Sequence, residues 1–491
     1  MIRRCADAAR TALVLALLTT LTVSCNRGDA TDDAIPSRPD IVVMLIDTLR
    51  ADWLSTYGFD LATSPELDTL AGECILFENA CSPAPWTLPS VVSLFTGRHV
   101  AEHGVLKRGD RLPETLETFT ETARDLGYTT TSWHRNPFAG ELSGLDRAFD
   151  ICELRPRQVD GTALDAFFDQ NPEPPYFLYI HNTQPHDPHV IRKRFYDTFA
   201  PVPDGFLQQY GGLMKSFRQL TRVDFVRDRP LGTTDNTKQQ QAKLEELATV
   251  VDEVHNLYSA SVRDADDCIG SVVAKLRERG RFDETLLIIL ADHGEEMGEH
   301  GGWQHDQSVY QELIHVPLLV RLPGGKHGGR RVQTPVSLVD VVPTLLDILE
   351  AEDVYDGPGR SLVPLLLEDE PDRAVEPRVV SMRHNQQKYF RPFKESRGDI
   401  NVVVRLDSWK AILNVEPDTV ELYDLATDPN ETSEVSADHP ELAEQLGGFA
   451  RRRYAEMESG SATAGSRDRD ALDAKTRKAL EDLGYVDKED P

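Results

Sequence analysis

Three apolar runs in the chain each end in a side chain that can bind a metal ion. They are Ile41–Ile46 before Asp47, Leu286–Ala291 before Asp292 and His293, and Tyr176–Ile180 before His181. A continuous apolar run of this length is typical of a parallel strand that is buried on both faces. Because functional sites in open α/β sheets lie beyond the carboxyl ends of such strands, three endings of this kind favour one shared site over separate helix caps.

Helical patterns separate these strands. One runs from Pro113 to Gly127, and a long amphipathic stretch runs from about Ala242 to Gly280. Alternating strands and helices predict an α/β fold, in which a large, mostly parallel sheet is sandwiched by helices. The polar stretch Phe195–Gln241 lacks a clear period and is interpreted as a loop or lid insertion.

The pattern becomes shorter after Val379. Val402–Leu406 and Trp409–Leu413 predict a small antiparallel C-terminal subdomain with a helix across it, and the charged end is expected to be a tail with one helix near Lys475. We therefore expect a targeting segment (1–25), a tether (26–38), a catalytic domain (39–378), the C-terminal subdomain (379–458) and the tail (459–491).

The first 25 residues have the features of a signal peptide. Arg3 and Arg4 precede the apolar run Thr11–Val23, which is too short to span a membrane, and Ser24-Cys25 follows. A small residue before Cys resembles the bacterial lipoprotein signal. We therefore expect a chain anchored to the membrane of the bacterial cell envelope through a lipid on Cys25, with plain secretion as the alternative.

Composition limits the partners. Hydrophobic residues make up 40% of the 491 residues, which is enough for a substantial core. The formal net charge of -29 argues against nucleic acid as a partner. An anionic substrate would need local positive charge from a metal ion, helix ends or a few Arg and His side chains.

The stretch around Thr87 has the signals of a helix start. Pro89 suits the first turn of a helix, and Gly97 suits its end. Thr87 would therefore lie at a helix N-terminus, where backbone N–H groups and the helix dipole favour an anion. Its hydroxyl is a candidate nucleophile toward a phosphate or sulfate ester, and an ordinary helix-entry turn is the alternative.

Further motifs follow one another in a recognisable order. They are Ile46-Asp47-Thr48-Leu49-Arg50-Ala51-Asp52, Thr63-Ser64-Pro65, Asp292-His293-Gly294-Glu295, Gly298-Glu299-His300-Gly301, Pro317-Leu318-Leu319-Val320, Val339-Asp340-Val341-Val342-Pro343-Thr344, Glu421-Leu422-Tyr423-Asp424-Leu425 and Leu483-Gly484-Tyr485-Val486. Over nearly the whole chain after residue 38, this order resembles the sulfatase family of the alkaline phosphatase superfamily. The resemblance implies that family's fold and a metal-dependent hydrolase of anionic esters.

The sequence departs from the family at the nucleophile. Sulfatases carry Cys or Ser in C-x-P-S-R before a T-G pair and oxidise that residue to formylglycine. Matching Thr96-Gly97 to the T-G pair places Thr87 at the nucleophile position, with Val91 replacing the Arg. Cys81-Ser82-Pro83 has the wrong distance to this pair and Pro85 in place of Arg. Thr87 therefore resembles the phosphodiesterase and phosphoglycerol-transferase branches, and no formylglycine is expected.

The site residues can be assigned from the strand endings and the resemblance together. Asp47, Asp292, His293 and Thr87 are expected to hold one divalent metal ion, which could be Ca²⁺, Mg²⁺, Mn²⁺ or Zn²⁺. The resemblance places His186 and His305 where the leaving group is protonated or the anion is bound, and Asn136 at a substrate contact. We interpret His181, His189 and His300 as structural or supporting residues.

The sequence is compatible with three functions. The first is a phosphoester hydrolase or transferase that works through Thr87 and a covalent threonyl ester. The second is a sulfuric ester hydrolase with an unmodified nucleophile. The third is a non-catalytic envelope lipoprotein that keeps the fold for binding, although the intact set of metal ligands argues against it.

Overall fold

The computed structural model describes residues 35–36, 38–171, 173–187, 195–199, 203–221, 234–367, 376–384, 400–466 and 472–485. An eight-stranded sheet forms its core, with the strand order β12-β2-β11-β8-β1-β7-β5-β6. The strands are β1 (Asp40–Ile46), β2 (Ile75–Phe77), β5 (Thr129–His134), β6 (Ile151–Leu154), β7 (Tyr176–Asn182), β8 (Thr285–Leu290), β11 (Leu318–Arg321) and β12 (Arg331–Val332).

The central strands explain the apolar runs of the sequence. β1 pairs in parallel with β7 on one side and with β8 on the other, and β5 continues the parallel order beyond β7. Every residue of β1, β7 and β8 is buried, because helices cover both faces of the sheet. The carboxyl ends of these strands therefore meet at one edge, and the predicted α/β sandwich is confirmed.

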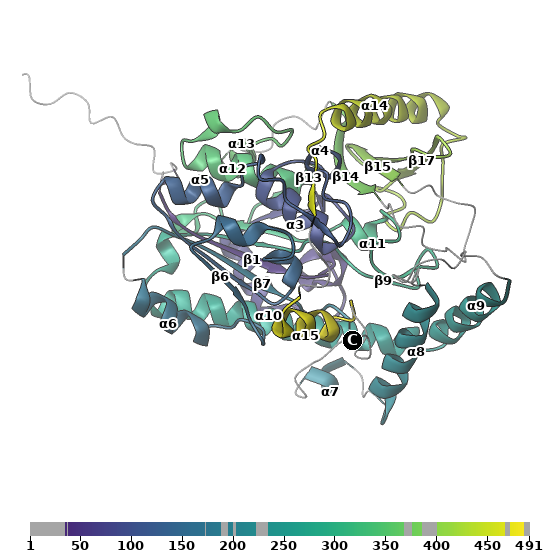
Figure 1. Cartoon of the computed structure of the whole chain (residues 1–491), viewed down its shortest axis with the longest axis horizontal. Coiled ribbons are helices and arrows are strands. Elements are labelled where there is room, and N and C mark those ends of the chain that lie inside the picture. The colour runs from purple at the N-terminus through teal and green to yellow at the C-terminus, as the bar shows by residue number, and fades with distance from the viewer. Residues whose placement is uncertain are drawn as a thin grey trace, which may run out of the picture. The chain divides into compact units, whose positions relative to one another are not determined.

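Two groups of helices cover the sheet (Figure 1). On one face, α3 (Thr87–Thr96), α5 (Phe119–Asp125) and α12 (Val341–Ile348) pack against one another. On the other face, α10 (Val251–Glu278) packs against α6 (Thr162–Gln170) and α2 (Pro65–Leu70). Smaller elements are α4 (Val100–His103), α11 (Gln311–Ile314), α13 (Val363–Leu367), β3 (Ala80–Cys81), β4 (Asp110–Arg111), β9 (Glu296–Met297), β10 (Trp303–Gln304), β13 (Val336–Ser337) and β18 (Gly465–Ser466).

A second, antiparallel sheet follows in the C-terminal part. It comprises β14 (Arg378–His384), β15 (Ile400–Leu406), β16 (Trp409–Asn414) and β17 (Thr419–Asp424) in that order, and α14 (Pro440–Ser459) packs across it. On β15, Val402 and Val404 share an apolar cluster with α14, whereas Val403 faces a cluster that contains Leu313 and Ile314. The sheet is thus buried on both faces, and the predicted subdomain and its helix are confirmed.

The segment predicted as an irregular loop is partly helical. It contains α7 (Tyr196–Phe199), α8 (Phe206–Thr221) and the start of α9 (Thr234–Ala248). α8 places Phe206, Tyr210 and Leu213 on one buried side, a helical spacing hidden by the surrounding polar residues. The predicted tail helix is present as α15 (Ala474–Asp482).

Some expectations stay predictions. The proposed lipid-bearing Cys25, the signal segment and most of the tether lie outside the described residues. Among the described residues, none of the helices combines the length and apolarity required of a membrane span. The predicted domain boundaries are also not tested by the fold.

Candidate active site

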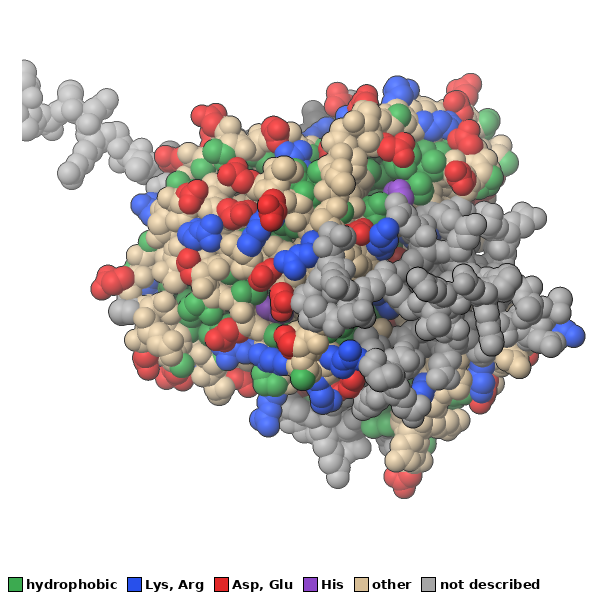
Figure 2. Space-filling model, in the orientation of Figure 1, with side chains coloured by type: hydrophobic (Ala, Val, Ile, Leu, Met, Phe, Trp, Pro, Cys, Tyr) green, Lys and Arg blue, Asp and Glu red, His purple; other side chains and the backbone are tan. Residues whose placement is uncertain are grey.

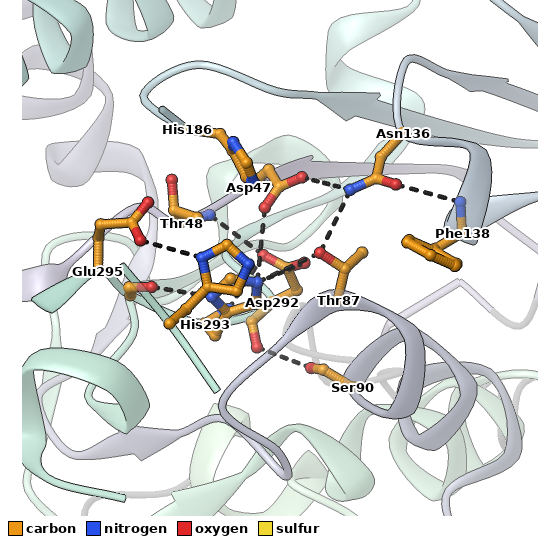
Figure 3. A network of polar contacts seen from close by, with 12 residues as sticks. Asp47, Thr48, Thr87, Ser90, Asn136, Phe138, His186, Asp292, His293 and Glu295 are labelled. Atoms are coloured by element: carbon orange, nitrogen blue, oxygen red, sulfur yellow. Dashed lines mark hydrogen bonds and ion pairs between the residues drawn. The ribbon is translucent and has the colours of Figure 1, made fainter. Parts of the chain in front are cut away.

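Thr87 is the first residue of α3 and lies at the edge where β1 and β8 end. Its Oγ1 is 3.2 Å from His293 Nε2, and the Asn136 amide donates a hydrogen bond to it at 3.3 Å. The helix ends as predicted at Gly97, which adopts the left-handed conformation. Figure 3 shows the Thr87 hydroxyl directed from the start of the helix toward Asp47 and Asp292.

Two carboxylates face this hydroxyl. Asp47 follows β1 and Asp292 follows β8, and both side chains are fully buried. One oxygen of each, Asp47 Oδ1 and Asp292 Oδ2, has no hydrogen-bond partner among the described residues. Buried acceptors are rarely left unpaired, so this pair of oxygens fits a bound cation.

His293 completes this group with a ring nitrogen that can accept a hydrogen bond or bind a cation. Its Nδ1 is 2.8 Å from the Gly294 carbonyl oxygen and therefore carries the hydrogen. Its Nε2 then presents a lone pair, 3.6 Å from Asp47 Oδ1 and 3.5 Å from Asp292 Oδ2. Glycine at 294 permits this turn, because a Cβ there would lie 2.0 Å from the Glu312 carbonyl oxygen. We call Asp47, Thr87, Asp292 and His293 the carboxylate side of the site.

The ionisation of the two carboxylates is coupled. Burial opposes the charge on Asp47, but His186, His181 and His293 lower its pKa below the ordinary value. Burial and the charge of Asp47 both raise the pKa of Asp292. Without an added positive charge the site therefore holds one carboxylate more readily than two, and a divalent cation would stabilise both in the charged form.

The turn after β1 is strained in a way that serves Asp292. Thr48 has a φ of 59°, which is unusual for a β-branched residue. This conformation directs its N–H toward Asp292 Oδ1 at 3.3 Å. Tyr258 on α10 holds the turn, because its hydroxyl donates to the Thr48 carbonyl oxygen at 2.5 Å and accepts from Arg50 N at 3.0 Å.

Asn136 and His181 both contact the other oxygen of Asp47. The Asn136 amide donates to Asp47 Oδ2 at 2.8 Å, and His181 Nε2 lies 3.3 Å from the same atom. Asp47, His181 and Asp292 each offer a ligand atom within 4.8 Å of the others. We favour His293 over His181 as the ligand, because His293 faces the two unpaired oxygens, whereas His181 faces an oxygen that Asn136 already occupies.

His186 and His305 form a second group. We call these two residues and Tyr485 the histidine side of the site. Their rings are 5.1 Å apart, and the ring of His305 also lies 4.7 Å from that of His293. His305 Nδ1 is held by Glu295 Oε1 at 3.0 Å, and His186 Nδ1 faces the Asp187 carbonyl oxygen. In both rings Nε2 is therefore the atom turned toward the site.

Tyr485, just beyond α15, reaches both imidazoles. Its hydroxyl lies 3.2 Å from His186 Nε2 and 3.4 Å from His305 Nε2. Burial and the charge of Asp47 raise its pKa, although a hydrogen bond with Thr87 works in the opposite direction. The phenol thus stays protonated, and it belongs to the histidine side.

The loop that carries His305 is fixed by contacts from distant segments. Gln304 and Asp306 on either side of it both have a φ of 71°. Asp306 N donates to the Pro85 carbonyl oxygen at 2.9 Å, and Arg383 of β14 donates to the Asp306 carbonyl oxygen at 2.8 Å. The C-terminal sheet therefore helps to position His305.

All the residues assigned from the sequence lie in this region. Asp47, Thr87, Asn136, Asp292 and His293 share direct contacts, and His186 and His305 are in ring contact beside them. Their roles are not tested by position alone and remain predictions. Sequence reasoning quoted Glu295 and Tyr485 only as members of two motifs, Asp292-His293-Gly294-Glu295 and Leu483-Gly484-Tyr485-Val486, and gave neither residue a role in the site. His189 lies outside the described residues.

Cys81 lies apart from this site. It is buried in the apolar cluster formed with Leu313, Ile314 and residues of the C-terminal sheet, and burial raises the pKa of its thiol. The neighbouring Ser82 hydroxyl donates to the Asp292 carbonyl oxygen, as Ser90 does at 2.7 Å. The Cys-Ser-Pro stretch thus supports the backbone of Asp292 from behind.

Basic and acidic side chains are mixed on the surface around α15. Figure 2 shows Lys and Arg side chains in this region with Asp and Glu side chains between them. α15 itself contributes Lys475, Arg477 and Lys478, and Lys478 pairs with Asp482 at 2.6 Å.

Comparison with known proteins identifies related sequences and folds. The model of the sulfatase family matches residues 39–351, and that of the N-sulphoglucosamine sulphohydrolase C-terminal region matches residues 298–448. An N-acetylglucosamine-6-O-sulfatase of Bacteroides thetaiotaomicron is 23% identical over 470 residues, covering 81% of this chain and 82% of that protein.

Solved structures share the fold at low identity. One, a protein in complex with its substrate D-glucosamine-2-N,6-O-disulfate, gives a TM-score of 0.65 at 21% identity, covering 85% of this chain and 98% of that one. A phosphonate monoester hydrolase of Agrobacterium radiobacter gives a TM-score of 0.62 at 21% identity, covering 88% of this chain and 100% of that one.

Proposed function

The chain belongs to the sulfatase family, and from this premise we propose that it is a metal-dependent hydrolase of sulfate, phosphate or phosphonate esters with Thr87 as nucleophile. One observation carries the proposal. The Thr87 hydroxyl lies at the start of α3, 3.2 Å from His293 Nε2 and beside two buried carboxylates that each have an unpaired oxygen. Such a hydroxyl is placed to be ionised and to attack an anionic centre.

In the first half of the reaction, Thr87 Oγ1 forms a bond to the sulfur or phosphorus atom and the bond to the leaving oxygen breaks. The first turn of α3 presents backbone N–H groups toward the transferred anion. A divalent cation held by Asp47, Asp292 and His293 would neutralise charge and help to ionise the Thr87 hydroxyl. Asn136 hydrogen-bonds both Thr87 and Asp47 and so fixes the nucleophile relative to the carboxylate.

The histidine side supplies the proton that the leaving oxygen needs. His305 is the better-supported donor, because Glu295 Oε1, 3.0 Å from its Nδ1, orients the ring with Nε2 toward the site. In the second half, water attacks the threonyl ester, and the Thr87 hydroxyl is restored. A transferase would use an acceptor alcohol in place of this water.

The similar proteins do not decide whether the transferred group contains sulfur or phosphorus. One is named for a sulfatase activity and another for phosphonate monoester hydrolysis. An unmodified threonine supports the phosphorus esters, since the aldehyde hydrate of sulfatases cannot form from it. A sulfuric ester hydrolase with an unmodified nucleophile is the second candidate, supported by the family model that covers most of the chain.

A substrate panel tests this proposal. The purified protein would be assayed with an aryl sulfate, an aryl phosphate, an aryl phosphonate monoester and a phosphodiester, after chelation and after addition of Ca²⁺, Mg²⁺, Mn²⁺ or Zn²⁺. We expect metal-dependent hydrolysis of at least one ester and a loss of about 10³-fold or more in Thr87→Ala. Thr96→Ala, at the other end of α3, is the matched control. A Thr87→Ala variant as active as the parent would overturn the mechanism.

We also propose that the protein is anchored to the bacterial envelope through a lipid on Cys25. The support is the signal-like sequence before Cys25, which resembles a lipoprotein signal. Expression of the full chain in a bacterial host with labelled palmitate should label the parent and not Cys25→Ala. Label in both proteins would contradict the assignment.

A further inference from the structure

We propose that Tyr485 is a substrate-positioning residue, delivered to the active site by the C-terminal helix α15. Its phenol would donate a hydrogen bond to the leaving-group side of the bound ester and determine which leaving groups fit. This inference rests on the proposed function of the site. It gives the C-terminal segment, expected from the sequence to be a tail, a direct role in the reaction.

The position of the hydroxyl is the first argument. It contacts His186 Nε2 at 3.2 Å and His305 Nε2 at 3.4 Å, the two atoms expected to face the leaving oxygen. These partners lie 299 and 180 residues away in the sequence, so the contacts depend on the fold and not on local geometry. A group that touches both imidazoles occupies the position next to the scissile bond.

The hydrogen-bonding capacity of the phenol supports a role as donor. His186 Nδ1 and His305 Nδ1 each face an oxygen that accepts, so both rings turn Nε2 toward Tyr485. When His305 is protonated, as proton donation to the leaving oxygen requires, its Nε2 carries a hydrogen and needs none from the phenol. The phenol hydrogen can then be donated to His186 Nε2 or to an ester oxygen that enters the site.

The rings around Tyr485 hold it firmly. Phe138 meets its ring edge to face at 5.2 Å, and the guanidinium of Arg108 lies 5.1 Å above it. Arg108 also approaches the Tyr485 carbonyl oxygen at 3.5 Å. Phe138 in turn contacts Trp86, the residue before Thr87, at 5.9 Å. A continuous row of aromatic rings thus links the C-terminal segment to the start of α3.

The segment before Tyr485 is anchored in the same way. Leu480, Leu483 and Tyr485 are all buried, and α15 packs against the short helix Pro137–Ala139 that follows Asn136. Asp473 caps the helix by accepting from Thr476 N at 2.7 Å. A segment anchored in this way forms a fixed wall of the site. This favours a substrate-positioning role for Tyr485 over the alternative, in which the segment blocks the site and must move away before substrate binds.

The test compares Tyr485→Phe and Tyr485→Ala with the parent, using the best aryl ester of the substrate panel and a series of phenol leaving groups. Removing the hydroxyl should lower kcat/KM about 10- to 100-fold, mainly through kcat, with a larger loss for poorer leaving groups. Removing the ring should in addition raise KM. Tyr454→Phe is the matched control, because its hydroxyl contacts only Glu458 on α14 among the described residues. Melting curves would show that every variant folds.

A binding measurement separates this inference from the proposed function. Titration of the metal-loaded protein with orthovanadate should give about tenfold weaker binding for Tyr485→Phe than for the parent and Tyr454→Phe. Parent-like kinetics and vanadate affinity in Tyr485→Phe would overturn the positioning role. A rise in activity in either Tyr485 variant would also overturn it, because it would show that Tyr485 blocks the site. If Thr87→Ala is inactive while Tyr485→Phe is unchanged, only the inference about Tyr485 fails.

Discussion

The two sides of the site are built in different ways. The carboxylate side comes from the ends of β1 and β8 and the start of α3, all within the layers around the main sheet. The histidine side comes from the segment after β7, the loop between β10 and α11, and the residue just beyond α15. Two strand ends and a helix start thus carry the carboxylates and the proposed nucleophile, whereas connecting segments carry the groups proposed to meet the leaving oxygen. On this proposal the sheet determines the chemistry and the loops determine the choice of substrate.

The largest expected effect is on the carboxylate side. Asp292→Asn removes the negative charge but keeps the size of a buried side chain that contacts Thr48 N at 3.3 Å. We expect at least a 10³-fold loss of kcat/KM together with loss of bound metal, measured by elemental analysis after gel filtration. Asp266→Asn, on α10 away from the site, serves as a buried-carboxylate control. Full metal content in Asp292→Asn would contradict the assignment of this residue as a ligand.

The next largest effect is expected on stability, from the buried ion pair that supports the loop carrying His305. Lys410 Nζ and Glu431 Oε1 form a fully buried ion pair at 2.6 Å, and Lys410 also donates to the Val309 carbonyl oxygen at 2.8 Å, near the His305 loop. Lys410→Met leaves the buried Glu431 carboxylate without its ion-pair partner, which should reduce the free energy of unfolding by about 3–5 kcal/mol. Urea unfolding would measure it. The double variant Lys410→Met/Glu431→Gln should recover part of the loss, and an equally unstable double variant would contradict this explanation.

His305→Ala should affect turnover without affecting the metal. The loss of kcat should be about 10²-fold for a poor leaving group and much smaller for an activated one, because an activated phenol leaves without a proton. Metal content should match that of the parent. An equal loss with every leaving group would place His305 in anion binding and not in proton donation.

The smallest effect is expected at Cys81. If Thr87 is the nucleophile, Cys81→Ala should keep kcat/KM within about threefold of the parent and lose only about 1–2 kcal/mol of stability from the smaller buried side chain. The assay would use protein expressed with a formylglycine-generating enzyme as well as without it. Abolished activity in Cys81→Ala, or activity only after coexpression, would show that the formylglycine route is used.

Sequence reasoning was most successful where a pattern has a simple physical cause. The burial of β1, β7 and β8 on both faces produces the unbroken apolar runs, so Asp47 and Asp292 could be placed at one edge. The Pro89 and Gly97 signals likewise located the helix that begins at Thr87. These features are local in the sequence or repeat along it.

The histidine side could be predicted only in part. His186 and His305 were assigned through the family resemblance, and no period or spacing links them. Tyr485 lies in a charged C-terminal stretch, and its contact with residues 180 and 299 positions away depends on how α15 packs. The helix α8 and the start of α9 were missed because polar surface positions outnumber the buried ones, whereas the rest of α9 lies in the helical stretch predicted from Ala242. Long-range contacts of this kind are not encoded in composition or periodicity.

The identity of the nucleophile is tested most directly by trapping the covalent intermediate. The parent protein would be mixed with its best ester, quenched in acid within the first turnover, digested and analysed by mass spectrometry. We predict that the peptide containing Thr87 gains the mass of the transferred sulfuryl or phosphoryl group, with fragment ions that place it on Thr87, and that the Cys81 thiol remains intact. The transferred group on another residue, or an aldehyde at Cys81, would contradict the account.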